Sequence, residues 1–203
     1  TEERLGFARN AIAWSLDKLE NKEQLDAPAS VVADRIQTST GYSAARDAEL
    51  VIEAVYEDRE TKRNAIRTLD GICRSDAIIG SNTSTIPITQ LAAASRHPER
   101  VIGIHFFGPV PLMRLVEITP APTTSQPVID AVIDFGRSVG KNPVLVKKDV
   151  PGFLMNRIFG AMTCEAIRLV EDGVGSIEDI DQGMCDGFNF RVGPLCIADL
   201  AGL

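Results

Sequence analysis

Apolar side chains recur at three- to four-residue intervals through the first 24 residues of the chain. They fall at Leu5, Ala8, Ile12, Leu16 and Leu19. This spacing is typical of an amphipathic helix, because residues three and four apart share one face of a helix. We therefore predict a helix of about five turns at the start of the chain.

Short, mostly apolar segments then alternate with helical patterns. We predict strands over residues 47–55, 77–84 and 100–107, with helices between them over residues 59–73 and 87–95. Further strands are predicted over residues 113–119 and 143–148, on either side of a helix over residues 126–139. Strands that alternate with helices are typical of an α/β fold, in which crossover helices join parallel strands.

The pattern changes at residues 149–152, which read Asp-Val-Pro-Gly. The strand-like segments stop there, and a long helical pattern runs from Phe153 to about Glu171. Ser176 then precedes acidic residues, which predicts a helix start, because a serine hydroxyl can cap the first turn and acids favour the positive end of the helix dipole. A last helix is predicted to begin near Pro194.

We therefore expect two domains. Residues 1–149 form the α/β domain with its parallel sheet, and residues 150–203 form an all-helical C-terminal domain. The first residue is Thr1 rather than Met, and the last helical pattern is cut off at Leu203. We expect the sheet domain to be incomplete at its N-terminus and the helical domain to be incomplete as well.

Composition and charge narrow the classes of partner. Of the 203 residues, 44% are hydrophobic and 24% are charged, which is ordinary for a globular protein with a core. The 21 Lys and Arg residues are scattered and are outnumbered by 28 Asp and Glu residues, which argues against a nucleic-acid partner. No apolar run reaches the roughly 18 residues of a membrane span, so we expect none.

The four cysteines give no sign of a metal site. Cys73, Cys164, Cys185 and Cys196 lie far apart, and none belongs to a C-x-x-C pair. We therefore expect reduced thiols and no bound metal. This favours a cytoplasmic protein, or one of the mitochondrial matrix if the source is eukaryotic.

Two residues could form an acid–base pair. His105 ends an apolar strand where the chain enters a Gly-Pro loop, and ligands bind at the carboxyl ends of strands in open α/β sheets. Glu117 lies between Val116 and Ile118 in the next strand, where a carboxylate is costly unless it is paired. Such a carboxylate can orient an imidazole and stabilise its protonated form. From position alone, His105 could equally be structural, and Glu117 could face water or an arginine.

Other polar residues lie near the same edge of the predicted sheet. Residues 81–85, Ser-Asn-Thr-Ser-Thr, end an apolar strand and lead into a helix. Their side chains can cap a helix or bind a ligand, and capping alone accounts for one or two of them. Asn156 follows the domain boundary, where it could face a cleft, although an exposed asparagine in a helix would be equally ordinary.

Four segments together carry a resemblance to a known family. They are SNTSTIPIT at residues 81–89, HFFGPVPLMRLVEI at 105–118, PGFLMNRI at 151–158 and EDIDQGMCDGFNFRVGPLCIADLAGL at 178–203. With these motifs in this order, the chain resembles the L-3-hydroxyacyl-CoA dehydrogenase family of fatty-acid β-oxidation over essentially all of its length. The resemblance implies a Rossmann-like NAD-binding domain, a helical domain, and interconversion of L-3-hydroxyacyl-CoA and 3-oxoacyl-CoA.

The resemblance also implies roles for individual residues. His105 matches the catalytic histidine, which accepts the proton of the substrate 3-hydroxyl as hydride passes to NAD, and Glu117 matches the acid paired with it. Ser84 matches the serine that hydrogen-bonds the reacting oxygen near the nicotinamide. Asn156 matches an asparagine that helps to hold the substrate from the helical domain.

Further contacts to cofactor and substrate are implied in the same way. Glu57 and Lys62 match positions that approach NAD; without the resemblance they would be assigned to a solvated first turn of a helix. Ser15 and Lys22 match positions that touch coenzyme A, and their spacing of seven places them on one helix face. The family also implies a homodimer.

Two features depart from the family pattern. Gly108 stands where relatives commonly have asparagine, so no side-chain amide lies beside His105. The G-x-G-x-x-G pattern that holds a pyrophosphate does not occur in the 203 residues. We therefore expect a segment of a longer enzyme that lacks the N-terminal unit with this pattern and the C-terminal helices, and that is inactive by itself.

Other interpretations stay open on this evidence. The protein could act on a related 3-hydroxy acid without coenzyme A, or it could belong to a multifunctional β-oxidation protein. It could also be a non-catalytic remnant, because the phosphate-binding loop is absent from the 203 residues.

Overall fold

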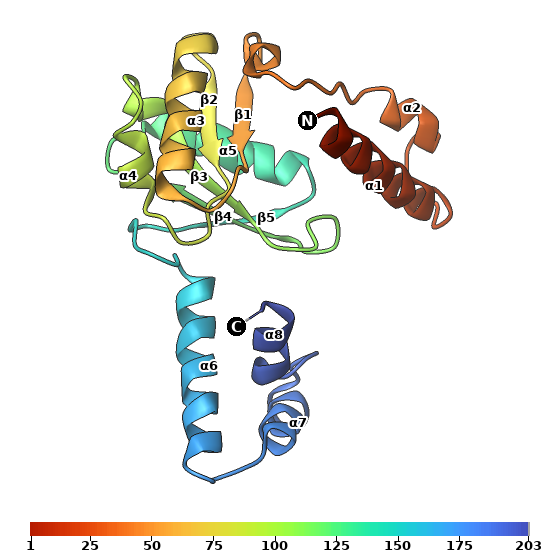
Figure 1. Cartoon of the computed structure of the whole chain (residues 1–203), viewed down its shortest axis with the longest axis vertical. Coiled ribbons are helices and arrows are strands. Elements are labelled where there is room, and N and C mark those ends of the chain that lie inside the picture. The colour runs from red at the N-terminus through yellow and green to blue at the C-terminus, as the bar shows by residue number, and fades with distance from the viewer. Residues whose placement is uncertain (203) are drawn as a thin grey trace.

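The computed structural model describes residues 1–202 and shows a sheet domain with a group of helices below it (Figure 1). The sheet has five strands in the order β1-β2-β3-β4-β5. The strands are β1 (Leu50–Glu53), β2 (Ile78–Ser81), β3 (Val101–Phe106), β4 (Leu115–Pro120) and β5 (Asn142–Leu145). The predicted α/β sheet followed by an all-helical domain is confirmed.

One pair of strands departs from the predicted parallel arrangement. β3 and β4 run antiparallel, whereas the other neighbouring strands pair in parallel. The reason is the short connection, because β3 ends at Phe106 and β4 begins at Leu115. A crossover between parallel neighbours needs a dozen or more residues. The antiparallel pairing places His105 directly opposite Glu117.

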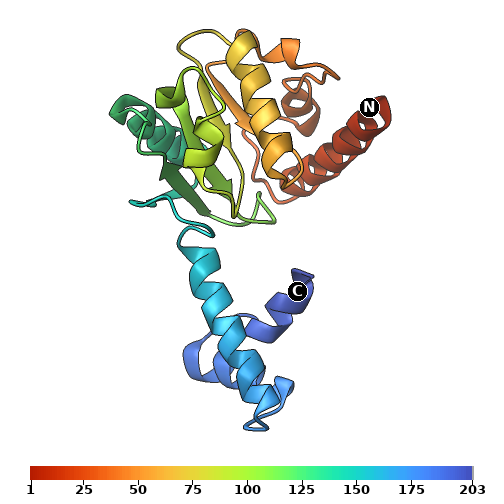
Figure 2. The same ribbon diagram turned by 60° about the vertical axis from the view of Figure 1, so that its left-hand side comes forward.

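Helices cover both faces of the sheet. α3 (Arg59–Ile72) and α4 (Ile88–Ala92) lie on one face, and α5 (Gln126–Ser138) lies on the other (Figures 1 and 2). Two apolar clusters fill the layers between them, one with Ile66, Leu69, Ile79, Ile88 and Val101, the other with Ile102, Ile104, Val116, Ile118 and Val132. A strand covered on both faces is a nearly continuous run of apolar residues, whereas a strand with one exposed face alternates apolar and polar residues. β3 is of the first kind.

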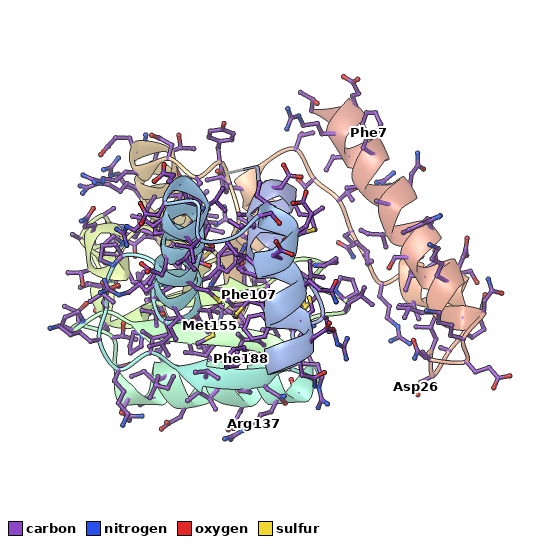
Figure 3. The ribbon with its side chains drawn as sticks, turned by 90° about the horizontal axis from the view of Figure 1, so that it is seen from below. Phe7, Asp26, Phe107, Arg137, Met155 and Phe188 are labelled. Atoms are coloured by element: carbon purple, nitrogen blue, oxygen red, sulfur yellow. The ribbon has the colours of Figure 1, made fainter. Side chains whose placement is uncertain are left out.

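The first helix lies to one side of the sheet. α1 (Glu2–Glu20) stands beside the sheet domain (Figures 1 and 3) and ends four residues before the predicted helix end. It packs against α2 (Ala29–Ala33). None of its residues is buried. The short α2 and the 3-10 helix η1 (Tyr42–Ala45) were not predicted, because each is too short to show an apolar period.

The C-terminal domain consists of α6 (Met155–Glu171), α7 (Ile177–Phe188) and α8 (Pro194–Leu200). Ser176 caps α7 by accepting a hydrogen bond from the N–H of Asp179, 3.0 Å away. Asp181 on α7 accepts hydrogen bonds from the N–H groups of Leu195 and Cys196. The side chain of Asp181 thus fastens the start of α8 to α7.

The connection between the domains is anchored to the sheet domain. The carboxylate of Asp149 accepts hydrogen bonds from the N–H groups of Ile88 and Thr89, at 2.9 and 2.7 Å. Burial of Phe153, which is 1% exposed, adds an apolar contact with the core beneath α3 and α4. The chain therefore enters α6 from a fixed position.

Residues 1–202 contain neither a membrane-spanning helix nor a cluster of metal-binding side chains. No helix there is long and apolar enough to cross a membrane. Over the same residues, no group of three or more His, Cys, Asp or Glu side chains could hold a metal ion.

Candidate active site

His105 and Glu117 lie side by side on the two antiparallel strands. The Nδ1 atom of His105 is 2.8 Å from Oε2 of Glu117. Both side chains are buried, with relative exposures of 8% for His105 and 0% for Glu117. Because an ionised carboxylate can only accept hydrogen bonds, Nδ1 carries a proton and donates it to Glu117. In the neutral ring, Nε2 is then the atom that can accept a proton.

The second oxygen of Glu117 binds the start of the helical domain. Oε1 accepts hydrogen bonds from the N–H groups of Leu154 and Met155, at 3.1 and 2.9 Å. Burial opposes ionisation of Glu117, but the hydrogen bonds from His105, Met155 and Leu154 outweigh it and hold the pKa of Glu117 below its ordinary value. The carboxylate therefore stays charged beside the imidazole.

Two aromatic rings flank the imidazole of His105. The ring centroid of Phe107 is 4.4 Å away and that of Phe153 is 6.0 Å away, both in tilted arrangements. Figure 3 shows the boundary between the sheet domain and the helical domain from below, with Phe107 and Met155 labelled. The rings limit the rotation of the imidazole, so its orientation is set by packing as well as by Glu117.

Glu57 holds the loop that carries Ser84. Its Oε1 accepts hydrogen bonds from the Thr83 hydroxyl at 2.5 Å, the Ser84 N–H at 3.1 Å and the Thr85 N–H at 3.3 Å. Burial opposes its ionisation, but the hydrogen bond from Thr83 and the ammonium of Lys62 outweigh it, so the pKa of Glu57 lies below its ordinary value. None of these bonds uses the Ser84 hydroxyl.

Lys62 lies buried beneath this loop. Its Nζ is 3.2 Å from Oε2 of Glu57 and 2.8 Å from Oε1 of Glu53, and its side chain is 1% exposed. It also donates a hydrogen bond to the carbonyl of Val55 at 3.1 Å. Lys62 is therefore closed off from solvent, and of this ion pair only Glu57, whose side chain is 39% exposed, reaches the surface.

Sequence reasoning missed Glu53, the other partner of Lys62. Besides the ammonium, its carboxylate accepts hydrogen bonds from the Val55 N–H and from the Ser81 hydroxyl, each at 2.7 Å. The signal was available, because Glu53 closes the apolar strand β1 much as Glu117 interrupts β4. A buried carboxylate needs a cationic or hydrogen-bonding partner.

Asn156 on α6 reaches back to the sheet domain. Its Nδ2 donates a hydrogen bond to the carbonyl oxygen of Ser84, 3.3 Å away. Asn82, just before that loop, accepts a hydrogen bond from the Phe106 N–H at 2.9 Å and so ties the end of β2 to the end of β3. The structure thus brings Ser84, Asn156, His105 and Glu117 to one junction.

Ser15 and Lys22 lie elsewhere, in a separate cavity. Both line a cavity of about 350 Å³ between α1 and the loop after β3. Its other lining residues are Trp14, Lys18, Leu19, Gln24, Pro109, Pro111 and Leu112. The cavity joins the predicted coenzyme A residues to the loop that follows His105, and its walls are apolar with two lysines.

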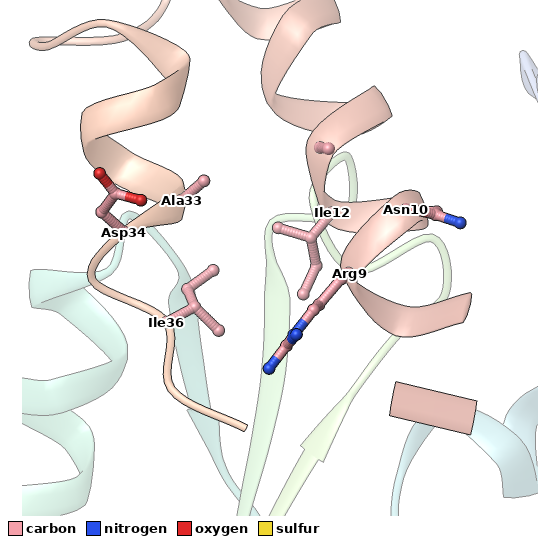
Figure 4. Close-up of a pocket in the computed structure, with 7 residues that line it drawn as sticks. Arg9, Asn10, Ile12, Ala33, Asp34 and Ile36 are labelled. Carbon is pink, nitrogen blue, oxygen red and sulfur yellow. The ribbon is translucent and has the colours of Figure 1, made fainter. Parts of the chain in front are cut away.

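A second cavity, of about 400 Å³, lies between α1 and α2 (Figure 4). Arg9, Ile12, Asp34 and Ile36 are among its lining residues. None of the predicted site residues lines it, so we assign it no part in the site.

Gly108 lies in the loop between β3 and β4. A Cβ atom added there would meet no atom within 4 Å. A larger side chain would therefore fit, and lack of space does not explain the glycine.

The fold and this junction define a class of protein. Polar residues gather where the parallel strands β1 and β2 of a Rossmann-like sheet end, which is where dinucleotides bind in this fold, and the His105–Glu117 pair lies against the start of the helical domain. The model of the 3-hydroxyacyl-CoA dehydrogenase NAD binding domain matches residues 1–150, and the model of the 3-hydroxyacyl-CoA dehydrogenase C-terminal domain matches residues 152–203. The chain belongs to the 3-hydroxyacyl-CoA dehydrogenase family of NAD-dependent enzymes. The predicted family, cofactor and enzyme class are confirmed.

Individual relatives agree with this assignment. The chain is 40% identical to 3-hydroxybutyryl-CoA dehydrogenase of Clostridioides difficile, over 93% of this chain and 67% of the relative. It is 38% identical to mitochondrial hydroxyacyl-coenzyme A dehydrogenase of Sus scrofa, over 100% of this chain and 67% of the relative. The crystal structure of (S)-3-hydroxybutyryl-CoA dehydrogenase PaaH1 from Ralstonia eutropha is 42% identical, with a TM-score of 0.88 over 93% of this chain and 67% of that one.

Proposed function

We propose that the protein interconverts an L-3-hydroxyacyl-CoA and the corresponding 3-oxoacyl-CoA, with His105 as the proton acceptor and donor. The observation that carries this proposal is the buried contact of 2.8 Å between His105 and Glu117. When bound, NAD supplies the hydride acceptor. The protein residues provide binding, orientation and the transfer of one proton.

The residues at the ends of β1 and β2 fit the nicotinamide end of NAD. Glu53 and Glu57 face Lys62, so the two carboxylates and one ammonium leave an excess of negative charge beneath the Ser84 loop. Of the two carboxylates only Glu57 is exposed, at 39%, and its negative charge would favour the cationic ring of oxidised NAD. The G-x-G-x-x-G pattern does not occur in the 203 residues, so no residue here is assigned to the pyrophosphate.

The proton of the substrate 3-hydroxyl passes to Nε2 of His105. Because Nδ1 already donates to Glu117, Nε2 is free to accept. The imidazolium that forms lies beside an ionised carboxylate, which stabilises it. In the reverse direction the same nitrogen returns the proton to the oxygen of the 3-oxo group.

Ser84 and Asn156 orient the reacting oxygen in this proposal. The Ser84 hydroxyl is unused by the hydrogen bonds that hold its loop, and Asn156 fixes the Ser84 carbonyl. Orientation of this kind lowers the entropy lost on reaching the transition state.

Coenzyme A would bind near the cavity between α1 and the loop after β3. Lys18 and Lys22 offer positive charge to its phosphates, and Trp14 and Leu112 offer apolar surface. We expect Lys22→Glu to raise KM for acetoacetyl-CoA about ten-fold while kcat changes little, since the phosphates do not react. The matched control is Lys147→Glu, an exposed lysine distant from this cavity in sequence.

The central test is a spectrophotometric assay of acetoacetyl-CoA reduction by NADH, in the full gene product. We expect His105→Gln to lower kcat by about 10²–10⁴-fold, the usual contribution of a general acid–base residue. His97→Gln, a half-exposed histidine beside Glu99, is the control and should retain wild-type kcat. Equal activity of His105→Gln and wild type would refute the proposal.

A substrate without coenzyme A is tested in the same assay. We expect 3-hydroxybutyryl-CoA to be oxidised with a kcat/KM far above that of free 3-hydroxybutyrate, because the free acid leaves the lysine-lined cavity empty. The reverse order would favour a 3-hydroxy acid dehydrogenase. No turnover of either substrate would favour a non-catalytic relative.

We also propose that the protein acts as a homodimer in a reducing compartment, the cytoplasm or a mitochondrial matrix. Exposed apolar side chains on the helical domain support the dimer; they include Ile158, Val174, Phe188 and Leu200. Four free cysteines support the compartment. Light scattering of the full gene product would test the dimer.

A further inference from the structure

We propose that Phe153 is a positioning residue for the acid–base pair. Its left-handed backbone aims two peptide N–H groups at Glu117, and its ring packs beside His105. This inference deepens the proposed function and rests on it, because the pair that Phe153 positions is the one assigned to proton transfer.

The backbone of Phe153 has a conformation that is rare for a residue with a side chain. Its φ is 47°, and that of the preceding Gly152 is 74°. A left-handed φ is unfavourable for a residue with a side chain, and residues in such conformations cluster where the surrounding structure needs them. Leu154 then returns to right-handed values, with φ −96° and ψ −58°.

A left-handed residue followed by a right-handed one turns successive N–H groups toward the same point. Such a concave arrangement of peptide N–H groups binds anions. Here the anion is Oε1 of Glu117, which accepts from the Leu154 and Met155 N–H groups at 3.1 and 2.9 Å. The conformation of Phe153 therefore decides where the Glu117 carboxylate lies.

The position of that carboxylate sets the position of the imidazole. Oε1 is held by the peptide groups, so Oε2 has one direction in which to meet Nδ1 of His105, at 2.8 Å. Without the two N–H donors, the Glu117 side chain could rotate about its last torsion, which is broad for a carboxylate. His105 would then lose its fixed tautomer and orientation.

The side chain of Phe153 explains how the unfavourable backbone is retained. Its ring is 1% exposed and belongs to the apolar cluster that contains Ile88, Leu91 and Val146. Its centroid lies 6.0 Å from that of His105. Burial of the ring offsets the cost of the backbone and at the same time closes one side of the imidazole.

The test compares alanine and glycine at this position. Both Phe153→Ala and Phe153→Gly remove the ring, but only glycine adopts a positive φ without strain. We expect kcat for acetoacetyl-CoA reduction to be about five-fold or more higher in Phe153→Gly than in Phe153→Ala, with similar KM values. In the control pair Phe159→Ala and Phe159→Gly, within α6, glycine should give no such advantage.

A milder pair of variants keeps the aromatic ring and tests the same backbone. Gly152→Ala and Gly140→Ala each place a Cβ at φ 74°, and neither Cβ would meet another atom closer than 3.4 Å. We expect similar losses of thermal stability in both but a fall in kcat, about three-fold or more, only in Gly152→Ala. Equal kcat values in the two variants would overturn the proposal.

An observable that needs no turnover separates this proposal from the proposed function. The Nδ1–H proton of His105 should give a slowly exchanging downfield NMR signal in the wild type and in Phe153→Gly. We expect that signal to broaden or disappear in Phe153→Ala and in Gly152→Ala. An unchanged signal in both of these variants would refute the positioning role, whether or not the protein proves to be a dehydrogenase.

Discussion

The side-chain amide of Asn156 donates a hydrogen bond to the carbonyl oxygen of Ser84, 3.3 Å away. It joins the first helix of the helical domain to the loop at the end of β2. Because Ser84 is otherwise held through its N–H by Glu57, the loop is fastened from both domains.

Removal of this link should loosen the Ser84 loop. We expect Asn156→Ala to lower kcat about ten-fold, the rate equivalent of one lost hydrogen bond. Steady-state kinetics with acetoacetyl-CoA and NADH would measure the effect. Asn64→Ala, at an exposed position of α3, should leave kcat unchanged, and a similar kcat for both variants would contradict the expectation.

Lys62→Met should destabilise the sheet domain severely. The variant leaves the Glu53 carboxylate buried without its cationic partner, which typically costs about 3–5 kcal/mol. Urea unfolding at neutral pH would measure it. Adding Glu53→Gln should recover part of the loss, since a neutral amide is cheaper to bury. The exposed Lys147→Met should change the free energy of unfolding by less than about 0.5 kcal/mol.

Asp70 should make stability fall in acid. Its carboxylate accepts hydrogen bonds from the guanidinium of Arg100 and the hydroxyl of Ser95, at 2.9 and 2.7 Å. Burial opposes its ionisation, but these bonds outweigh it and hold the pKa of Asp70 well below its ordinary 3.8. A lowered folded-state pKa gives stability that is present above pH 3.8 and is lost progressively as the pH falls below it.

Replacement of Asp70 by asparagine should remove this part of the pH dependence of stability. Asp70→Asn should be less stable than wild type at pH 7 and should lose less further stability on acidification. Urea unfolding between about pH 6 and pH 3 would measure both effects. The exposed Asp47→Asn should show the same free energy of unfolding as wild type at each pH. If the free energy of unfolding of Asp70→Asn fell with pH as steeply as that of wild type, the Asp70 carboxylate would not contribute to the pH dependence.

Gly193 should not tolerate alanine. A Cβ there would overlap Cγ of Asp181, the side chain that caps α8. We expect Gly193→Ala to lower the free energy of unfolding by about 1–3 kcal/mol. Gly183→Ala, in the middle of α7 with no atom near its added Cβ, should instead raise it by about 0.5–1 kcal/mol. Thermal denaturation of both variants would test this contrast.

Much of the fold could be predicted from the sequence, because its strands are continuous apolar runs and its longer helices have a clear apolar period. The antiparallel β3–β4 pair was not predicted, although the short connection from Phe106 to Leu115 contains the necessary information. Helix α2 was missed because five residues are too few to show a period.

The site was predictable in part for a similar reason. A carboxylate in an apolar strand singled out Glu117, and the same signal at Glu53 was overlooked because it falls at a strand end. The conformation of Phe153 could not be predicted, since a phenylalanine gives no sign that tertiary packing holds it at a positive φ. Likewise, burial of Lys62 depends on partners brought together by folding.

The anchored connection between the domains has a consequence for making chimeras. Asp149 is hydrogen-bonded to the start of α4, and Leu154 and Met155 are hydrogen-bonded to Glu117. Both ends of the segment from residue 149 to residue 155 are therefore held by the sheet domain. A chimera that exchanges the helical domain at residue 150 would keep the hydrogen bond of Asp149 but would replace Leu154 and Met155, whose N–H groups bind Glu117. A junction placed after Met155 would keep all of these hydrogen bonds within the sheet domain's own sequence. The hybrid protein should then have an intact acid–base pair.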